Sequence, residues 1–266
     1  MFRQSICAAV LAVAAAQVVV SAPVRAENFY LTEHGMQPGT LLQANDGTVA
    51  RARHQRHTSA NPAFPNAVMA LSQVAVDVEG HVYFCSGLDR YVMQLLDGRN
   101  EVLVIEAEEQ IRDVACNQDA QTFYYSVLAT PQSGQPLPDG IIYRRYLGDA
   151  RPTVVATVRQ ADIGGNWWGT FTAIDGVLYL ATNEPDSRIF KNSGGVVTHI
   201  GTARGFRISG LSCTTAGTFH FTTNSGKVYR TTNDFSVIEP ALVTDLQLRD
   251  VVTRPVTAPR AARPSR

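Results

Sequence analysis

Two Arg-Asp pairs have the residue types and spacing best suited to chemistry in this sequence. Arg112-Asp113 and Arg249-Asp250 occupy the same place in two similar segments, IRDVAC and LRDVVT. Two carboxylates brought together from separate segments could serve as the acid and base of glycoside hydrolysis, and we take all four residues as candidate ligand-binding residues. The alternative is that each pair satisfies its own charges and the neighbouring loop amides.

A second candidate site consists of oxygen-bearing side chains. Asn183 and Asn224 follow two similar strand-like segments, and His34 has the same place beside Glu33. A ring of such oxygens, with Glu33, Asn183 and Asn224 as ligands, would suit Ca²⁺ or another divalent cation. Asn at such a position is also a common turn former.

Aromatic and basic loop residues form a third group. Trp167 lies in the glycine-containing segment IGGNWW and could be a stacking platform for a sugar or other flat ligand, or a lid over the end of a blade. Trp168 fills a repeated apolar position, so we expect it in the core. The basic run 51–57 includes His54 and His57 and could bind an anionic ligand, although a solvated loop is the alternative.

These residues lie within a repeated unit of four short strands. The first strand has the pattern apolar, two other residues, apolar, two small residues, and a fixed period of this size indicates a solenoid or propeller. Second strands such as VYFC and FYYS carry adjacent large residues, as expected where both sheet faces are covered. The first strands start 40, 57, 40 and 40 residues apart, at Leu71, Ile111, Trp168, Ile208 and Leu248.

The count of strands predicts how the ring closes. The segment Leu248–Thr253 has the pattern of the first strand of a blade, but no second, third or fourth strand follows it. The segment Asn28–Ala52 has a second, third and fourth strand but no first strand before them. One composite blade made of both segments gives an all-β, five-bladed propeller of four-stranded antiparallel blades, without open sheet edges between the termini. Residues 27–253 therefore form one domain.

The long insertions fall on one predicted face of the ring. They are residues 53–70, 129–139 and 159–167, and they join either one blade to the next or the second strand of a blade to the third. Loops of these two kinds share a face because the strands alternate in direction. A rigid scaffold with one elaborated face is typical of a binding protein, so we place the site there, over the central channel.

The ends of the chain predict an exported protein. Residues 1–26 read as a removable export signal, with Arg3, an apolar run over Ile6–Val20 and a Val24-Arg25-Ala26 cleavage site. We expect a periplasmic or extracellular monomer without a membrane span in the mature chain, and a disordered tail over 254–266. With 23 basic and 23 acidic residues, the chain is not expected to bind nucleic acid.

The cysteines fit small core positions. Cys85, Cys116 and Cys213 occupy places where the other repeats have Ser, Thr, Ala or Val, so buried free thiols are expected. A bridge between Cys85 and Cys116 is the alternative in an oxidising compartment.

The Tyr-centred second strands and the turn followed by Val228-Tyr229-Arg230 resemble exported bacterial β-propellers with NHL, YVTN and SMP-30/gluconolactonase-like repeats. The SMP-30-like lactonases hold a metal through Glu, Asn and Asp in a six-bladed ring, and the resemblance implies such roles for Glu33, Asn183 and Asn224. Here the count is five blades, without a matching family motif. Our leading hypothesis is a non-catalytic scaffold that binds a small molecule, glycan or protein; a metal-dependent lactonase and a carbohydrate-binding or carbohydrate-active protein are the alternatives.

Overall fold

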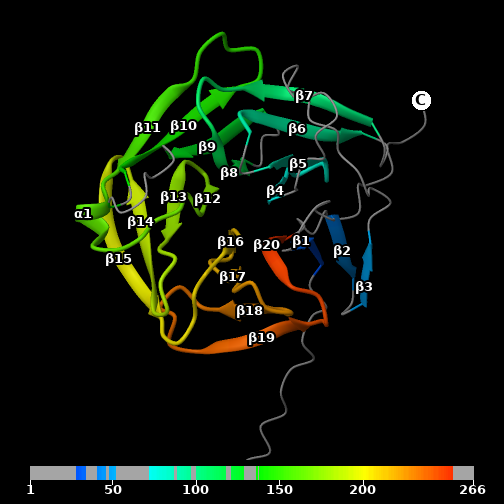
Figure 1. Ribbon diagram of the computed structural model, residues 1–266, viewed down its shortest axis with the longest axis vertical. Coiled ribbons are helices and arrows are strands. Elements are labelled where there is room, and N and C mark those ends of the chain that lie inside the picture. The colour runs from blue at the N-terminus through cyan, green and yellow to red at the C-terminus, as the bar shows by residue number, and fades with distance from the viewer. Residues whose placement is uncertain are drawn as a thin grey trace, which may run out of the picture.

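The structure is a ring of five antiparallel sheets of four strands each, and Figure 1 views it along the ring axis. It is a computed structural model, and it describes residues 28–33, 41–45, 48–51, 72–86, 89–96, 100–117, 121–128, 136 and 138–253. The predicted five-bladed β-propeller is confirmed. The strands are β4(Gln73–Val76), β5(Val82–Cys85), β6(Tyr91–Leu96) and β7(Asn100–Glu106) in blade 1; β8(Ile111–Cys116), β9(Thr122–Leu128), β10(Gly140–Tyr146) and β11(Thr153–Val158) in blade 2; β12(Phe171–Ile174), β13(Val177–Ala181), β14(Ser187–Ser193) and β15(Val196–Ala203) in blade 3; β16(Gly210–Cys213), β17(Phe219–Thr222), β18(Lys227–Thr231) and β19(Ile238–Val243) in blade 4; and β20(Leu248–Thr253), β1(Phe29–Glu33), β2(Leu41–Asn45) and β3(Thr48–Arg51) in the composite blade.

The composite blade closes the ring as the strand count predicts. Strand β1 pairs with β20 in antiparallel register, with Phe29 opposite Thr253 and Leu31 opposite Val251. The sheet order β20-β1-β2-β3 places the C-terminal strand innermost, next to the N-terminal strand (Figure 1). Pairing of the two ends removes the sheet edges that an open ring would expose.

The core is divided among the five interfaces between blades. Each interface has its own buried apolar cluster, since both faces of every sheet are covered by a neighbour. Strands β5 and β9 are buried at every residue, which explains why their sequences do not alternate. Edge-to-face contacts such as Tyr83 with Phe123 (4.7 Å) and Tyr179 with Phe219 (5.1 Å) join the second strands of adjacent blades, each contributing roughly 0.5–1.5 kcal/mol beyond area burial.

A β-bulge recurs between the third and fourth strands of the blades. The register shifts between Val92 and Met93, and the three following blades repeat the shift at Ile142/Tyr143, Ile189/Phe190 and Val228/Tyr229. A bulge increases the local twist of a sheet and bends its outer strand. Pro240 lies just beyond the bulge on β19, the outermost strand of blade 4, where a missing N–H is tolerated.

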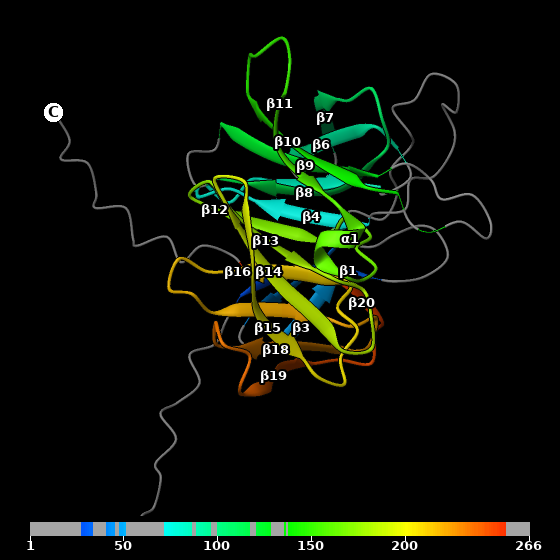
Figure 2. The ribbon, with the colours of Figure 1, turned by 90° about the vertical axis from the view of Figure 1, so that its left-hand side faces the viewer.

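One short helix, α1(Gln160–Ile163), lies between blades 2 and 3 and ends at Gly164 in the left-handed conformation. In the edge view of Figure 2 it lies at one end of the strands, beside the chain that leads into blade 3. Within the described residues, no helix has the length and apolar character needed to cross a bilayer.

Candidate functional site

Four of the predicted site residues, Arg112, Asp113, Arg249 and Asp250, lie near the start of two of the five innermost strands, β8 and β20. Strands β4, β8, β12, β16 and β20 pack against one another in a closed ring around the axis. We define the mouth as the two consecutive residues of each blade that lie at matching repeat positions within two residues of the start of its innermost strand. The first tier is Ser72, Arg112, Gly169, Ser209 and Arg249, and the second tier is Gln73, Asp113, Thr170, Gly210 and Asp250.

Asp113 and Asp250 in the second tier link neighbouring blades. The Asp113 carboxylate accepts hydrogen bonds from the N–H of Val114 at 2.7 Å and from the N–H of Phe171, in blade 3, at 2.9 Å. The Asp250 carboxylate repeats the arrangement: it accepts from Val251 in its own strand and from Val74, in blade 1, at 2.8 Å. Each aspartate therefore satisfies two backbone donors of the innermost strands, which face the axis and have no further sheet strand beside them.

Burial raises the pKa of both carboxyl groups, Asp113 and Asp250. Desolvation raises the pKa of Asp113 well above its usual range, and the nearby charge of Asp250 raises it further, against the lowering effect of the two N–H donors and Arg249. Desolvation likewise raises the pKa of Asp250 to about 7, while the bonds from Val74 and Val251 lower it. The two acids are thus electrostatically coupled across the mouth.

This geometry matches the structural alternative for the two acids. Their oxygens are already engaged by backbone N–H groups of their own strand and of the next blade. A glycosidase acid and base must reach the scissile bond and a water molecule. Asp113 and Asp250, as arranged here, hold the innermost strands of adjacent blades together.

The arginines of the first tier are more open to solvent. Arg112 and Arg249 are both partly exposed. The Arg112 Nε donates to the Leu128 carbonyl at 3.4 Å, and burial together with repulsion from Arg249 lowers the pKa of Arg112. The Arg249 guanidinium has no hydrogen bond or ion pair to the part of the chain that the structure describes, although its charge lowers the pKa of both aspartates.

Hydroxyl groups of the second strands fix the backbone of the mouth. Thr32 donates to the Ser72 carbonyl at 2.8 Å, Ser126 to the Gly169 carbonyl at 2.8 Å, and Thr222 to the Arg249 carbonyl at 2.7 Å. Each bond joins one blade to the next at the same repeat position. Sequence reasoning treated this position only as small and buried, and the recurrence of Ser and Thr there is the signal that could have revealed the hydrogen bonds.

The predicted core position of Trp168 is wrong, and of the two alternatives for Trp167 the stacking platform is contradicted. Trp167 is fully buried between blades 2 and 3, with Nε1 donating to the Thr170 carbonyl at 2.8 Å, so its rings cannot serve as an open stacking platform. Trp168, predicted in the core, is 43% exposed. The cause is Gly169, whose φ of 102° turns the chain before β12 begins at Phe171, so that Trp167 takes the core position.

The three candidate metal ligands come from three different blades. The Asn183 amide donates to the Ile208 carbonyl at 2.8 Å, Asn224 has a left-handed φ of 55°, and Glu33 lies at a bulge opposite Leu248. These contacts suit turn and loop residues. Within the described residues there is no group of three or more His, Cys, Asp or Glu that could hold a metal ion, and the predicted cation site stays a prediction.

Some predicted features lie elsewhere. His54 and His57 fall outside the described residues, as do the export signal and the 254–266 tail. Cys85, Cys116 and Cys213 are free thiols, so the alternative Cys85–Cys116 bridge is not formed.

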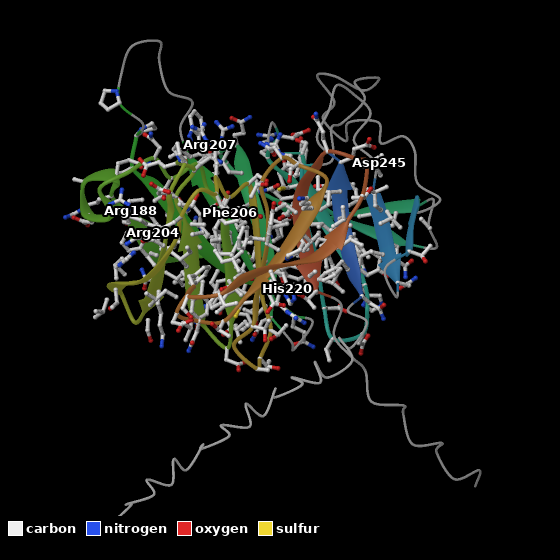
Figure 3. All side chains as sticks on the ribbon, turned by 90° about the horizontal axis from the view of Figure 1, so that it is seen from below. Arg188, Arg204, Phe206, Arg207, His220 and Asp245 are labelled. Carbon is white, nitrogen blue, oxygen red and sulfur yellow. The ribbon has the colours of Figure 1, made fainter. Side chains whose placement is uncertain are left out.

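A separate hollow lies on the outer side of blade 3, away from the mouth. It has a volume of about 250 Å³ and is lined by α1 and by Arg188, Phe190 and His199. Arg188 is engaged there by Glu184 at 3.2 Å and by the Gly164 carbonyl. Figure 3 shows Arg188 and Arg204 toward this side, whereas Arg207 and Asp245 lie toward the end of the ring that carries the blade-to-blade loops, and His220 lies toward the opposite end.

The fold and the mouth define the class of the protein as a five-bladed β-propeller with weak similarity to gluconolactonase-like propellers. No protein-family model matches the sequence, and no curated protein sequence matches it.

Three similar solved structures illustrate the range of this fold. A nidogen/laminin complex has a TM-score of 0.53 at 11% identity, covering 85% of this chain and 97% of that one. A gluconolactonase from Xanthomonas campestris has a TM-score of 0.50 at 15% identity, with coverages of 85% and 79%. TolB from Acinetobacter baumannii has a TM-score of 0.51 at 12% identity, with coverages of 89% and 68%. Identities this low show a shared fold, and function must be argued from the site.

Proposed function

We propose that this protein is an exported, non-catalytic propeller that binds an anionic ligand at the mouth, with Arg249 as the main contact and Arg112 beside it. The ligand is a small molecule or an acidic group of a partner. The observation that carries the proposal is the partly buried Arg249 guanidinium, which has no partner among the described residues.

The two nearby acids do not neutralise this guanidinium by direct contact. Asp113 and Asp250 direct their oxygens to backbone N–H groups, and burial raises the pKa of both, which reduces their negative charge near neutral pH. The mouth therefore offers positive charge in a partly desolvated position. A planar guanidinium in such a setting binds carboxylate or phosphate groups through paired hydrogen bonds.

Similar propellers serve both binding and catalysis. One is part of a nidogen/laminin complex, and another is a gluconolactonase. We favour binding because the only acid pair at the mouth, within the described residues, is committed to links between blades.

Titration of the ¹⁵N-labelled protein with propionate and with inorganic phosphate, followed through the arginine Nε–H signals, tests the proposal. We expect saturable shifts in the wild type and their loss in Arg249→Gln. Arg207→Gln removes an exposed arginine from the same end of the ring and should leave binding unchanged. Equal binding by wild type and Arg249→Gln, or no binding by the wild type, would contradict it.

Export is tested separately by expressing the full chain in a bacterial host. Cleavage after Ala26 predicts a periplasmic or secreted product that begins at Glu27, which intact mass measurement would detect. An intact precursor in the cytoplasm would contradict this part of the proposal.

A further inference from the structure

Two buried polar atoms at the mouth have no hydrogen-bond partner among the residues that the structure describes. They are Ser72 Oγ and Gln73 Oε1, on consecutive residues that are 1% and 4% exposed. Only five such side-chain atoms occur in the described part of the chain, and two of them meet here. A buried acceptor without a donor costs free energy, so such an atom requires an explanation such as a bound group or an ordered water.

Going round the ring, blade 1, which carries Ser72 and Gln73, lies between the composite blade with Arg249 and blade 2 with Arg112. Ser72 and Gln73 begin blade 1, Arg249 begins the composite blade on one side, and Arg112 begins blade 2 on the other. The links are direct, since Asp250 accepts a hydrogen bond from the N–H of Val74, the residue after Gln73. One sector of the mouth thus combines two guanidinium groups with an unpaired amide oxygen and an unpaired hydroxyl.

The repeat explains why Gln73 lacks the bond that its counterparts make. Asp250 and Asp113 occupy the same repeat position as Gln73, and each reaches the N–H of the next innermost strand, at Val74 and Phe171. For Gln73 the corresponding donor is the N–H of Val114. That N–H already donates to Asp113 at 2.7 Å, so the Gln73 oxygen is left without it.

We propose that the ligand of the mouth is a hydroxycarboxylic acid in its carboxylate form, and that its hydroxyl group forms hydrogen bonds with the side chains of Gln73 and Ser72. This inference rests on the proposed anion binding by Arg249. The Gln73 oxygen can only accept a hydrogen bond, so it selects a donor on the ligand. A hydroxyl suits this sector better than an ammonium group, because the guanidinium groups of Arg249 and Arg112 repel a second cation.

A site with a buried acceptor discriminates against an analogue that lacks the donor, because that analogue leaves the acceptor unpaired. A single hydrogen bond of this kind corresponds to about tenfold in affinity. The wild type should therefore bind glycerate about tenfold more tightly than propionate, which has the same carbon chain and carboxylate but no hydroxyl.

Calorimetric or NMR titration with these two compounds provides the test. Gln73→Met keeps the length of the side chain and removes the acceptor, so we expect it to bind glycerate and propionate equally and to keep the propionate affinity of the wild type. Ser72→Ala serves as the second variant, with a smaller loss of discrimination. Thermal melts establish that each variant is folded.

The outcomes separate this inference from the proposed function. If the wild type binds both compounds equally, the hydroxyl preference is overturned and an ordered water accounts for Gln73, while anion binding stands. If discrimination persists unchanged in folded Gln73→Met and Ser72→Ala, the assignment of these residues is overturned. If neither compound binds, the proposed function fails together with the inference.

Discussion

Replacement of Asp250 by Asn tests whether the buried acids act as pH-sensitive links between blades. The folded protein raises the pKa of Asp250 from about 3.8 to about 7, so the native state binds a proton more tightly than the unfolded chain. Its contribution to the free energy of unfolding is therefore greatest below the unfolded pKa and is lost as the pH rises through the folded value. Integrated between pH 5 and pH 8, this single shift corresponds to roughly 2–3 kcal/mol.

The assay is urea unfolding of the wild type at pH 5, 6, 7 and 8. We expect the free energy of unfolding to fall with increasing pH by about 2–3 kcal/mol, with a further fall from Asp113, whose pKa is shifted in the same direction. Asp250→Asn should flatten this dependence. It should also lower stability at pH 5 by roughly 1–3 kcal/mol, because both oxygens of the neutral carboxylic acid can accept from Val74 and Val251, whereas an amide has a single accepting oxygen.

Asp234→Asn is the control. Asp234 is exposed, and bonds from Thr232 and Ser236 lower its pKa to about 2, so it does not titrate in this window. That variant should keep the wild-type slope. A wild-type stability that is constant or rises between pH 5 and pH 8, or an unchanged slope in Asp250→Asn, would refute the reasoning.

Three further predictions concern packing and thiol chemistry. Gly210→Ala would place a methyl group 2.2 Å from the Asp250 Oδ1 and 2.5 Å from the Asp250 Cα, which would push β16 away from β20. We expect urea unfolding to show a loss of stability of about 1–3 kcal/mol, and an unchanged midpoint would contradict this close packing. Trp167→Ala should lower the free energy of unfolding by about 3–5 kcal/mol because the Trp167 ring is buried, whereas Trp168→Ala should lower it by less than about 1 kcal/mol because Trp168 is 43% exposed. A larger loss of thermal stability in Trp168→Ala than in Trp167→Ala would contradict the assignment of Trp167 to the core. Thiol titration of the protein lacking residues 1–26, unfolded without reductant, should detect all three free cysteines, whereas a count of one would indicate a bridge.

The architecture could be predicted from the sequence because every blade repeats the same four strands. The composite blade followed from Leu248–Thr253 and Asn28–Ala52 each lacking what the other has, and the pairing of Tyr30 with Val252 confirms it. Repetition works at this level because each blade solves the same packing problem with the same apolar positions.

The details of the mouth could not be predicted in the same way. The spacing of Trp167 and Trp168 suggested the wrong core residue because a positive φ at Gly169 shifts the start of β12, and a lone glycine does not reveal its φ. The bonds of Asp113 to Phe171 and of Asp250 to Val74 join residues from different blades, so they depend on the angle between sheets. The Gln73 side-chain oxygen is unpaired because the N–H of Val114 donates to Asp113 instead, and the sequence does not show which of these two acceptors is used.

The direct pairing of Phe29 with Thr253 makes the backbone almost circular, with its single break inside one sheet. A circularly permuted protein in which a short linker joins Thr253 to Phe29, with new termini in the exposed turn at Gly194-Gly195, would keep the strands of every blade. Such a rearranged molecule would carry its new ends on the outer wall of blade 3, and immobilisation through them would present the propeller edge-on, with both ends of its axis free.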